Sequence, residues 1–184
     1  MTKPPKLFII FGPSGAGKTT AGAVMAEKIK VEIFSTDKIR RTKPFRAKTH
    51  DYQKTGKFFP KTLRRQFYLK LMADGKKELL KGHNVILDAT FSSAWMWQMA
   101  EKLAAQTRAQ MIPMEIILEK ISDATLKRRL ENRLKQDQQA AQPQIYWAYK
   151  NRFQPYAQKH FVINNDGSRA KLRKQILEIL NEIL

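Results

Sequence analysis

Nine residues near the N-terminus have the types and spacing of a phosphate-binding loop. The stretch GPSGAGKTT matches the pattern G-x-x-x-x-G-K-[ST] through Gly12, Gly17, Lys18 and Thr19. Glycines let successive backbone N–H groups turn inward around an anion, and a following helix adds the positive end of its dipole. The stretch therefore predicts a loop that binds the phosphates of a nucleotide. A tight glycine-rich turn between a strand and a helix is the alternative.

Each position of this loop has an expected role. The residues expected to bind the nucleotide are Gly12, Pro13, Ser14, Gly15, Ala16, Gly17, Lys18, Thr19 and Thr20. The ammonium group of Lys18 would meet the β- and γ-phosphates, and the hydroxyl of Thr19 would meet a Mg²⁺ ion. Lys18 is therefore a candidate catalytic residue, and Thr19 is a candidate metal ligand.

A carboxylate and an arginine follow the second apolar run of the chain. The stretch VEIFSTD ends in Asp37, and Arg40 comes one helical turn later. Ligands of open parallel sheets sit at the carboxyl ends of the strands, so both side chains are expected to face the γ-phosphate. Asp37 would then take or orient the proton of an acceptor hydroxyl. The alternative is that Ser35, Thr36 or Asp37 only caps a short helix.

A second carboxylate ends the third apolar run, NVILDAT. Asp88 is expected at the same edge of the sheet, where it would hold Mg²⁺ through water or orient a neighbouring group. Its alternative role is to cap the helix that follows. We predict a metal site made by Thr19 and Asp88.

Two arginines four residues apart lie in the stretch LKRRLENRL. Arg129 and Arg133 fall on one face of a predicted helix. Two guanidinium groups on a closing helix would stabilise the charge on a phosphoryl group during its transfer. The alternative is a solvated basic face. The polar stretch that follows favours a lid, expected at about 122–150.

The elements that must position these residues are strands alternating with helices. Five apolar runs of strand length occur along the chain: KLFIIFG, VEIFSTD, NVILDAT, MIPMEIILE and HFVINND. Helices are predicted over 18–29, 61–81, 94–107, 122–138 and 168–184, whereas 43–60 and 138–144 are expected to be irregular. The alternation predicts an α/β protein: a three-layer phosphate-loop NTPase fold with a five-stranded, mainly parallel sheet and a helical lid.

The length and composition of the chain limit the number of domains and the expected cellular location. The chain has 184 residues, of which 42% are hydrophobic, so we expect one domain over 1–184. It contains no cysteine, which excludes disulfide frameworks and thiol catalysis. The apolar run at its start is too short for a signal sequence or a membrane span. We therefore expect a cytoplasmic protein that has no membrane partner.

The net charge of +19 is concentrated in the segment from Lys38 to Arg65, where eleven basic residues face one acid, Asp51. Such a segment predicts contact with nucleic acid or another polyanion, and a solvated surface is the alternative. Aromatic residues that could stack on bases are interleaved with or follow it: Tyr52, Phe58, Phe59, Phe67 and Tyr68. Phe67 and Tyr68 would equally fit a buried core, and Phe58 and Phe59 a loop that packs inward.

These motifs together resemble a family of kinases with a phosphate-binding loop. Its best-known members are polynucleotide 5′-hydroxyl kinases and the kinase domains of RNA-repair ligases, and it is related to zeta-toxin-like and AAA-type small ATP-binding kinases. The resemblance rests on GPSGAGKT, on D-x-x-R in STDKIRR, on NVILDAT and on R-x-x-x-R in RRLENR, in that order. It spans about residues 7–153.

The resemblance implies phosphotransfer that depends on ATP and Mg²⁺. It implies that Asp37 is the general base, that Arg40 holds a phosphate of the acceptor, and that Arg129 and Arg133 belong to a lid. A nucleic-acid 5′-hydroxyl is the acceptor that the basic segment favours. A small-molecule hydroxyl on a metabolite, sugar or antibiotic stays open, as does an ATP-binding switch that transfers nothing.

Overall fold

Five parallel strands form one sheet in the computed structural model, which describes residues 3–55, 57–137, 140, 143–150, 153–154 and 156–184. The strands are β1 (Lys6–Phe11), β2 (Ile33–Ser35), β3 (Val85–Asp88), β4 (Gln110–Ile117) and β5 (Phe161–Asn164). Their order across the sheet is β2-β3-β1-β4-β5, and every pairing is parallel. The predicted α/β class and phosphate-loop NTPase fold are confirmed, with a sheet that is parallel throughout.

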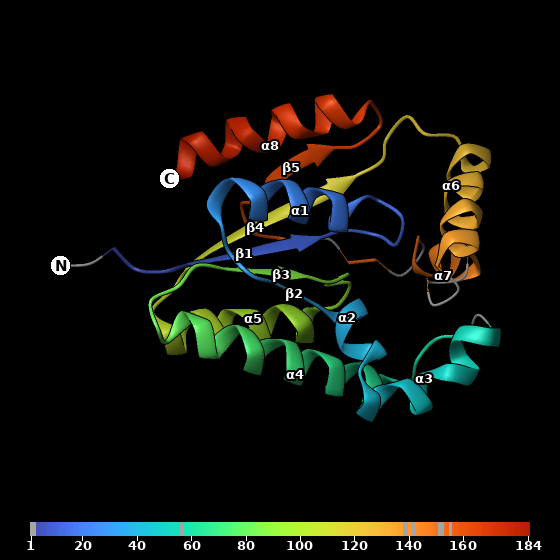
Figure 1. Ribbon diagram of the computed structural model, residues 1–184, viewed down its shortest axis with the longest axis horizontal. Coiled ribbons are helices and arrows are strands. Elements are labelled where there is room, and N and C mark those ends of the chain that lie inside the picture. The colour runs from blue at the N-terminus through green and yellow to red at the C-terminus, as the bar shows by residue number, and fades with distance from the viewer. Residues whose placement is uncertain (1–2, 56, 138–139, 141–142, 151–152, 155) are drawn as a thin grey trace.

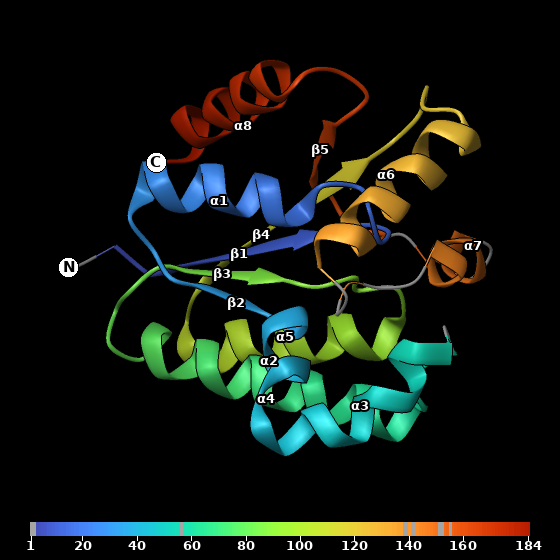
Figure 2. The same ribbon diagram turned by 45° about the vertical axis from the view of Figure 1, so that its right-hand side comes forward.

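Helices cover both faces of this sheet. The helices α1 (Lys18–Ile29) and α8 (Arg169–Ile183) lie on one face, and α4 (Lys61–Leu79) and α5 (Ala94–Thr107) lie on the other (Figure 1, Figure 2). The central strand β1 is buried on both sides. Leu7 and Ile9 pack in the core beneath α4 and α5, while Phe8 and Ile10 pack in the core beneath α1 and α8. This two-sided burial explains why the strand is a continuous apolar run.

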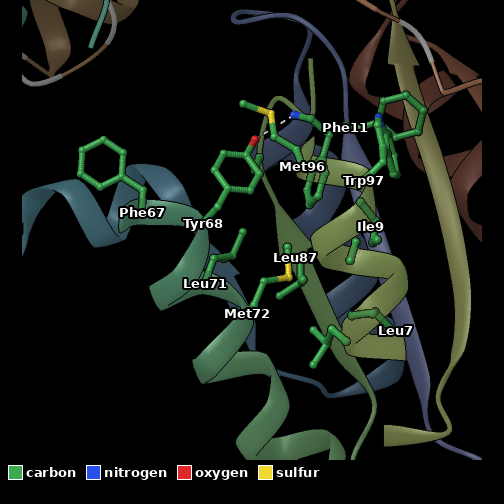
Figure 3. Close-up of a cluster of buried hydrophobic side chains, with 14 of the residues drawn as sticks. Leu7, Ile9, Phe11, Phe67, Tyr68, Leu71, Met72, Leu87, Met96 and Trp97 are labelled. Carbon is green, nitrogen blue, oxygen red and sulfur yellow. Dashed lines mark hydrogen bonds between the residues drawn. The ribbon is translucent and has the colours of Figure 1, made fainter. Parts of the chain in front are cut away.

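The core beneath α4 and α5 is rich in aromatic side chains (Figure 3). The hydroxyl of Tyr68 accepts a hydrogen bond of 2.9 Å from the backbone N–H of Phe91. The ring of Trp97 meets Phe11 edge to face at 4.7 Å between centroids. Phe67 and Tyr68 are each only 4% exposed. These two residues are therefore core side chains and do not form an exposed surface on which a nucleic-acid strand could stack.

Two helices follow β2 at the carboxyl edge of the sheet: α2 (Thr36–Arg41) and α3 (Lys43–Thr55). The prediction of irregular structure over 43–60 was wrong for most of its length. Pro44 is tolerated because it lies in the first turn, where its missing N–H has no helical partner to lose. Phe45, Thr49 and Tyr52 form a stripe at helical spacing. Thr49 is buried, and the two rings pack against the core.

Two further helices, α6 (Asp123–Gln136) and α7 (Pro143–Lys150), lie beyond the carboxyl ends of the strands (Figure 1). They share a small core made by Leu126, Leu130 and Tyr146. The hydroxyl of Ser122 caps α6 by accepting from the N–H of Thr125, so the helix starts as predicted and ends two residues before the predicted 138. Of the segment 138–144 that was predicted to be irregular, 138–139 and 141–142 lie outside the described residues.

The bounds of α1 and α5 are those predicted, α8 is one residue shorter at each end, and α4 ends two residues before the predicted 81. Gly82 follows α4 with a φ of +82°, a left-handed conformation that favours glycine. Leu172, Ile176 and Leu180 bury the inner stripe of α8. Within the described residues, no helix combines the length and the apolar character needed to cross a bilayer.

The aromatic core predicts unequal effects of two truncations in α4. Leu71 is fully buried, whereas Leu69, two residues earlier, is 53% exposed. Leu71→Ala should lower the free energy of unfolding by about 2–5 kcal/mol, because it removes buried methyl groups and leaves a cavity. Leu69→Ala should change it by less than about 1 kcal/mol. Urea unfolding monitored by circular dichroism measures both, and equal losses would contradict the assigned packing.

Candidate functional site

The register of three neighbouring strands assembles the site. Asp88, at the end of β3, is level with Ile10 of β1 on one side and with Ser35 of β2 on the other. The phosphate-binding loop begins two residues after Ile10, and Asp37 comes two residues after Ser35. All three candidate motifs therefore meet at one edge of the sheet, as predicted.

The loop after β1 adopts a conformation that only glycine accommodates at key positions. Gly12 has a φ of +133°, and a Cβ there would collide with the carbonyl oxygen of Ile116. Gly17, with a φ of +100°, starts α1, and a Cβ there would collide with the side-chain amide of Asn165. The positive φ angles favour glycine at both fixed positions of the motif, and the nearby backbone adds a packing requirement at Gly12.

Asn165 is a supporting residue that the motif analysis did not include. Its side-chain Nδ2 donates a 2.7 Å hydrogen bond to the carbonyl oxygen of Ala16, which ties the loop to the segment after β5. The available signal was the polar run after the last strand, because the carboxyl end of β5 lies at the same edge of the sheet.

A cavity of about 380 Å³ opens above this loop. Its lining includes loop residues, residues after β2 and β3, and residues of α6: Ser14, Gly15, Gly17, Lys18, Thr19, Thr20, Thr36, Asp37, Asp88, Ala89, Thr90, Arg129, Leu130 and Arg133. We call it the loop cavity. Both predicted α6 arginines reach it. Gly12, Pro13 and Ala16 do not line it.

Lys18 and Thr19 occupy the floor of the loop cavity. The ammonium Nζ of Lys18 donates a 2.8 Å hydrogen bond to the carbonyl oxygen of Pro13. Burial lowers the pKa of Lys18, and the nearby carboxylates of Asp88 and Asp37 oppose that shift. An anion bound in the cavity would favour the charged ammonium for the same reason.

The hydroxyl of Thr19 donates a 3.0 Å hydrogen bond to Oδ2 of Asp88. Ser93 occupies the cap position of α5, so Asp88 does not cap that helix. Burial and the charge of Asp37 raise the pKa of Asp88, while Lys18 and the hydrogen bond from Thr19 oppose the shift. A nearby divalent cation would favour the ionised form of this carboxylate.

The pair of Thr19 and Asp88 fits a Mg²⁺ ion that is held mainly by phosphates and water. Magnesium is bound by oxygen ligands, and in nucleotide sites one or two protein oxygens are enough. Across the described residues, no group of three or more His, Cys, Asp or Glu side chains could hold a metal ion. The oxygen pair at the cavity floor suits a metal that enters with a nucleotide.

Asp37 is shared by two arginines. Its Oδ1 accepts from Nε of Arg40 at 3.1 Å, and its Oδ2 accepts from Nη2 of Arg133 at 3.1 Å. The carboxylate is still 42% exposed, because it faces the cavity. Desolvation raises the pKa of Asp37, but Arg40, Arg133 and Lys18 together outweigh it and hold that pKa below its ordinary value. Asp37 is therefore ionised at neutral pH.

The cap of α2 is Ser35, whose hydroxyl accepts from the N–H of Lys38. Asp37 therefore does not cap α2, and that alternative is wrong. Arg40 is only 4% exposed, and it does not line the loop cavity. It lines a second, smaller cavity of about 110 Å³ that Asp37 also lines. We call it the aromatic cavity because of the rings in its lining: Tyr52, Phe58, Phe59, Phe67 and Tyr68.

The basic segment from Lys38 to Arg65 is only partly an open surface. Arg41 forms a two-pronged ion pair with Asp137, with N–O distances of 2.6 and 3.2 Å, and Arg40 pairs with Asp37. Exposed cations remain along α2, α3, the segment between α3 and α4, and the start of α4: Lys38, Lys43, Arg46, Lys48, Lys57, Lys61 and Arg65. The side chain of Lys54 lies outside the described residues.

Comparisons with known proteins fit this geometry. A family model described as an AAA domain matches residues 7–156, and the chain belongs to this family. No curated protein matches the sequence. The fold is similar to that of three kinases of known structure.

The first of these is a sugar kinase from Janibacter sp. HTCC2649, with a TM-score of 0.74 and 13% identity over 97% of this chain and 95% of that one. A gluconokinase from Sinorhizobium meliloti 1021 has a TM-score of 0.69 and 14% identity over 99% and 95%. The APS kinase of Mycobacterium tuberculosis, solved with AMPPNP and APS, has a TM-score of 0.68 and 15% identity over 98% and 99%.

The shared carboxylate predicts a shift in the titration of Asp37. Arg133→Met should raise the pKa of Asp37, because it removes a cation that favours the ionised form. Arg129→Met is the matched control, since Arg129 lies on the same face of α6 and lines the same cavity.

Carbon-13 NMR of aspartate-labelled protein, with the signal assigned through Asp37→Asn, measures the titration midpoint. The titration midpoint of Asp37 should move to higher pH in Arg133→Met only. An unchanged midpoint, or an equal rise in both variants, would contradict the ion pair.

Proposed function

We propose that the protein is a kinase that transfers the γ-phosphate of ATP to a hydroxyl of a small molecule. The observation that carries this proposal is the position of Asp37 between the loop cavity and the aromatic cavity, whose linings share Ser14, Thr36, Asp37 and Thr90. A nucleotide tail in the first cavity and an acceptor in the second would meet at this carboxylate. The resemblance in fold to sugar kinase, gluconokinase and APS kinase supports the small-molecule acceptor.

The bonds that form and break in the proposed reaction involve ATP, the acceptor hydroxyl and the carboxylate of Asp37 at the junction of the two cavities. The acceptor oxygen forms a bond to the γ-phosphorus, and the bond from that phosphorus to the β,γ-bridging oxygen breaks, so ADP leaves. The acceptor proton passes to the carboxylate of Asp37, which then returns it to solvent. Asp37 suits this role because it is ionised and faces the cavity.

The loop cavity would bind ATP through its phosphates. Backbone N–H groups of the loop and the ammonium of Lys18 would bind the phosphate oxygens, and the start of α1 adds its dipole. Thr19 and Asp88 would hold Mg²⁺, which neutralises charge on the β- and γ-phosphates when it is bound.

The helices α6 and α7 would act as the lid, with Arg129 and Arg133 facing the transferred group. Arg133 is bonded to Asp37 at 3.1 Å, so a γ-phosphate in the loop cavity would compete with this carboxylate for its guanidinium group. The same arginine would then stabilise charge on the phosphoryl group during transfer.

Acceptor-dependent turnover separates a kinase from an ATP-binding switch. ATP consumption should rise when a hydroxylated acceptor is added, and Asp37→Asn should lower that transfer by about 10²-fold or more while ATP affinity stays within about threefold. Lys18→Ala should weaken ATP binding or transfer. Coupled measurement of ADP release with a panel of hydroxyl compounds tests this. Equal slow hydrolysis with every compound would support the switch and refute the kinase.

A nucleic-acid 5′-hydroxyl is a second candidate acceptor, and it is favoured by the exposed cations of α2 and α3. The aromatic residues of this region give it less support than the sequence suggested, because Phe67 and Tyr68 are core and Phe59 packs on Phe67 at 5.5 Å. Binding of a polynucleotide across these cations would release counterions.

Salt dependence tests this second acceptor. Affinity for a 5′-hydroxyl oligonucleotide should fall with salt at a log–log slope of roughly −0.7 for each phosphate contacted. The double variant Lys43→Ala/Lys48→Ala on α3 should reduce the slope by about one to two contacts. Fluorescence anisotropy at several salt concentrations measures it, and a flat response would leave these cations as a solvated surface.

A further inference from the structure

The aromatic cavity has walls of a kind that few hydroxylated compounds would match. It lies between α3, the segment after it and α4. The ring of Phe59 meets Tyr52 at 5.7 Å and Phe67 at 5.5 Å, both edge to face. Met96 and Ile145 add further apolar surface. At about 110 Å³ the cavity is smaller than the ~150 Å³ of a protein cavity known to hold benzene, so a single flat ring is the largest apolar group that it would take.

The charges on the same walls favour an anion. Three cations line the cavity, namely Arg40, Lys57 and Arg64, against the single carboxylate of Asp37. That carboxylate already accepts hydrogen bonds from Arg40 and Arg133. The positive charge of Arg64 and Lys57 is thus not balanced within the lining.

Arg64 carries the most specific signal. Its Nε is buried and has no hydrogen-bond partner among the described residues, although the side chain lines the cavity. A buried N–H of this kind is costly unless a water molecule or a ligand accepts its hydrogen bond. The planar guanidinium group is suited to two-pronged binding of a phosphate, sulfate or carboxylate. An anionic group on the acceptor would satisfy this N–H and neutralise the charge.

We propose, on the basis of the proposed kinase function, that the acceptor is a small hydroxylated anion with a flat apolar ring, and that Arg64 binds its anionic group. The ring lies among Tyr52, Phe59 and Phe67, and the reacting hydroxyl meets Asp37 at the junction of the cavities. Ring-free polyhydroxyl compounds such as gluconate are poor acceptors, because the apolar walls leave their hydroxyls unpaired. Arg64 is a specificity-determining residue rather than a catalytic one.

Binding of matched probes tests this inference. The protein is saturated with AMPPNP and Mg²⁺ and titrated by calorimetry with 4-(hydroxymethyl)phenyl phosphate, with 4-(hydroxymethyl)phenol, which lacks the anion, and with glycerol 3-phosphate and gluconate, which lack the ring. The first compound should bind roughly tenfold or more tightly than each of the others, because it alone satisfies both the guanidinium group and the aromatic walls. Equal binding, tighter binding of a ring-free compound, or no binding of the first compound would overturn the inference.

Two neighbouring arginines provide the matched variants. Arg64→Met should weaken binding of the aromatic phosphate roughly tenfold or more and leave AMPPNP binding unchanged. Arg65→Met, at an exposed position that does not line the cavity, should leave both unchanged. Thermal unfolding checks that both variants fold. Unchanged affinity in Arg64→Met would remove this residue from the acceptor site.

Different results would reject the anionic aromatic acceptor and the kinase function. Gluconate that is phosphorylated efficiently, with no effect of Arg64→Met, would leave the kinase intact and reject the anionic aromatic acceptor. ATP hydrolysis that no hydroxyl compound stimulates, by contrast, would reject the kinase itself.

Discussion

The site depends on the register of three parallel strands. Because Asp88 is level with both Ile10 and Ser35, the ends of β1, β3 and β2 deliver the phosphate-binding loop, a buried carboxylate and Asp37 to one edge. A shift of one residue in β3 would turn the side chain of Asp88 to the opposite face of the sheet. The two-sided core around β1 fixes this register, and so the packing of the fold also determines the chemistry of the site.

Electrostatics then connect the sheet to the helices beyond it. Asp37 on α2 pairs with Arg133 on α6, and Arg41 on α2 pairs with Asp137 just after α6. Both contacts join segments 96 positions apart in the chain. They hold α6 above the loop cavity through exchangeable ion pairs, whereas the contact between α6 and α7 is a small apolar core. An arrangement of this kind allows a helix to respond to charge in the cavity.

Short sequence patterns predicted the residues that directly follow strands. They did not predict contacts between residues that are far apart in the chain. The loop from Gly12 and the carboxylate at Asp88 were found because an apolar run ends directly before each. The helix α3 was not predicted, because its inward-facing stripe is short and includes the polar residue Thr49. Asn165 and Asp137 have roles set by distant partners, Ala16 and Arg41, which no local pattern reveals. The aromatic residues were noticed, but their inward packing required the structure.

The central claim is that the loop amides hold the phosphate tail of a nucleotide within reach of Asp37. A crystal structure with ADP, Mg²⁺ and aluminium fluoride tests it most directly. The account predicts the β-phosphate at hydrogen-bond distance from the backbone N–H groups of Gly15 to Thr19, with the fluoride group between Arg133 and Asp37. A nucleotide bound away from this loop, or a metal fluoride facing away from Asp37, would contradict it.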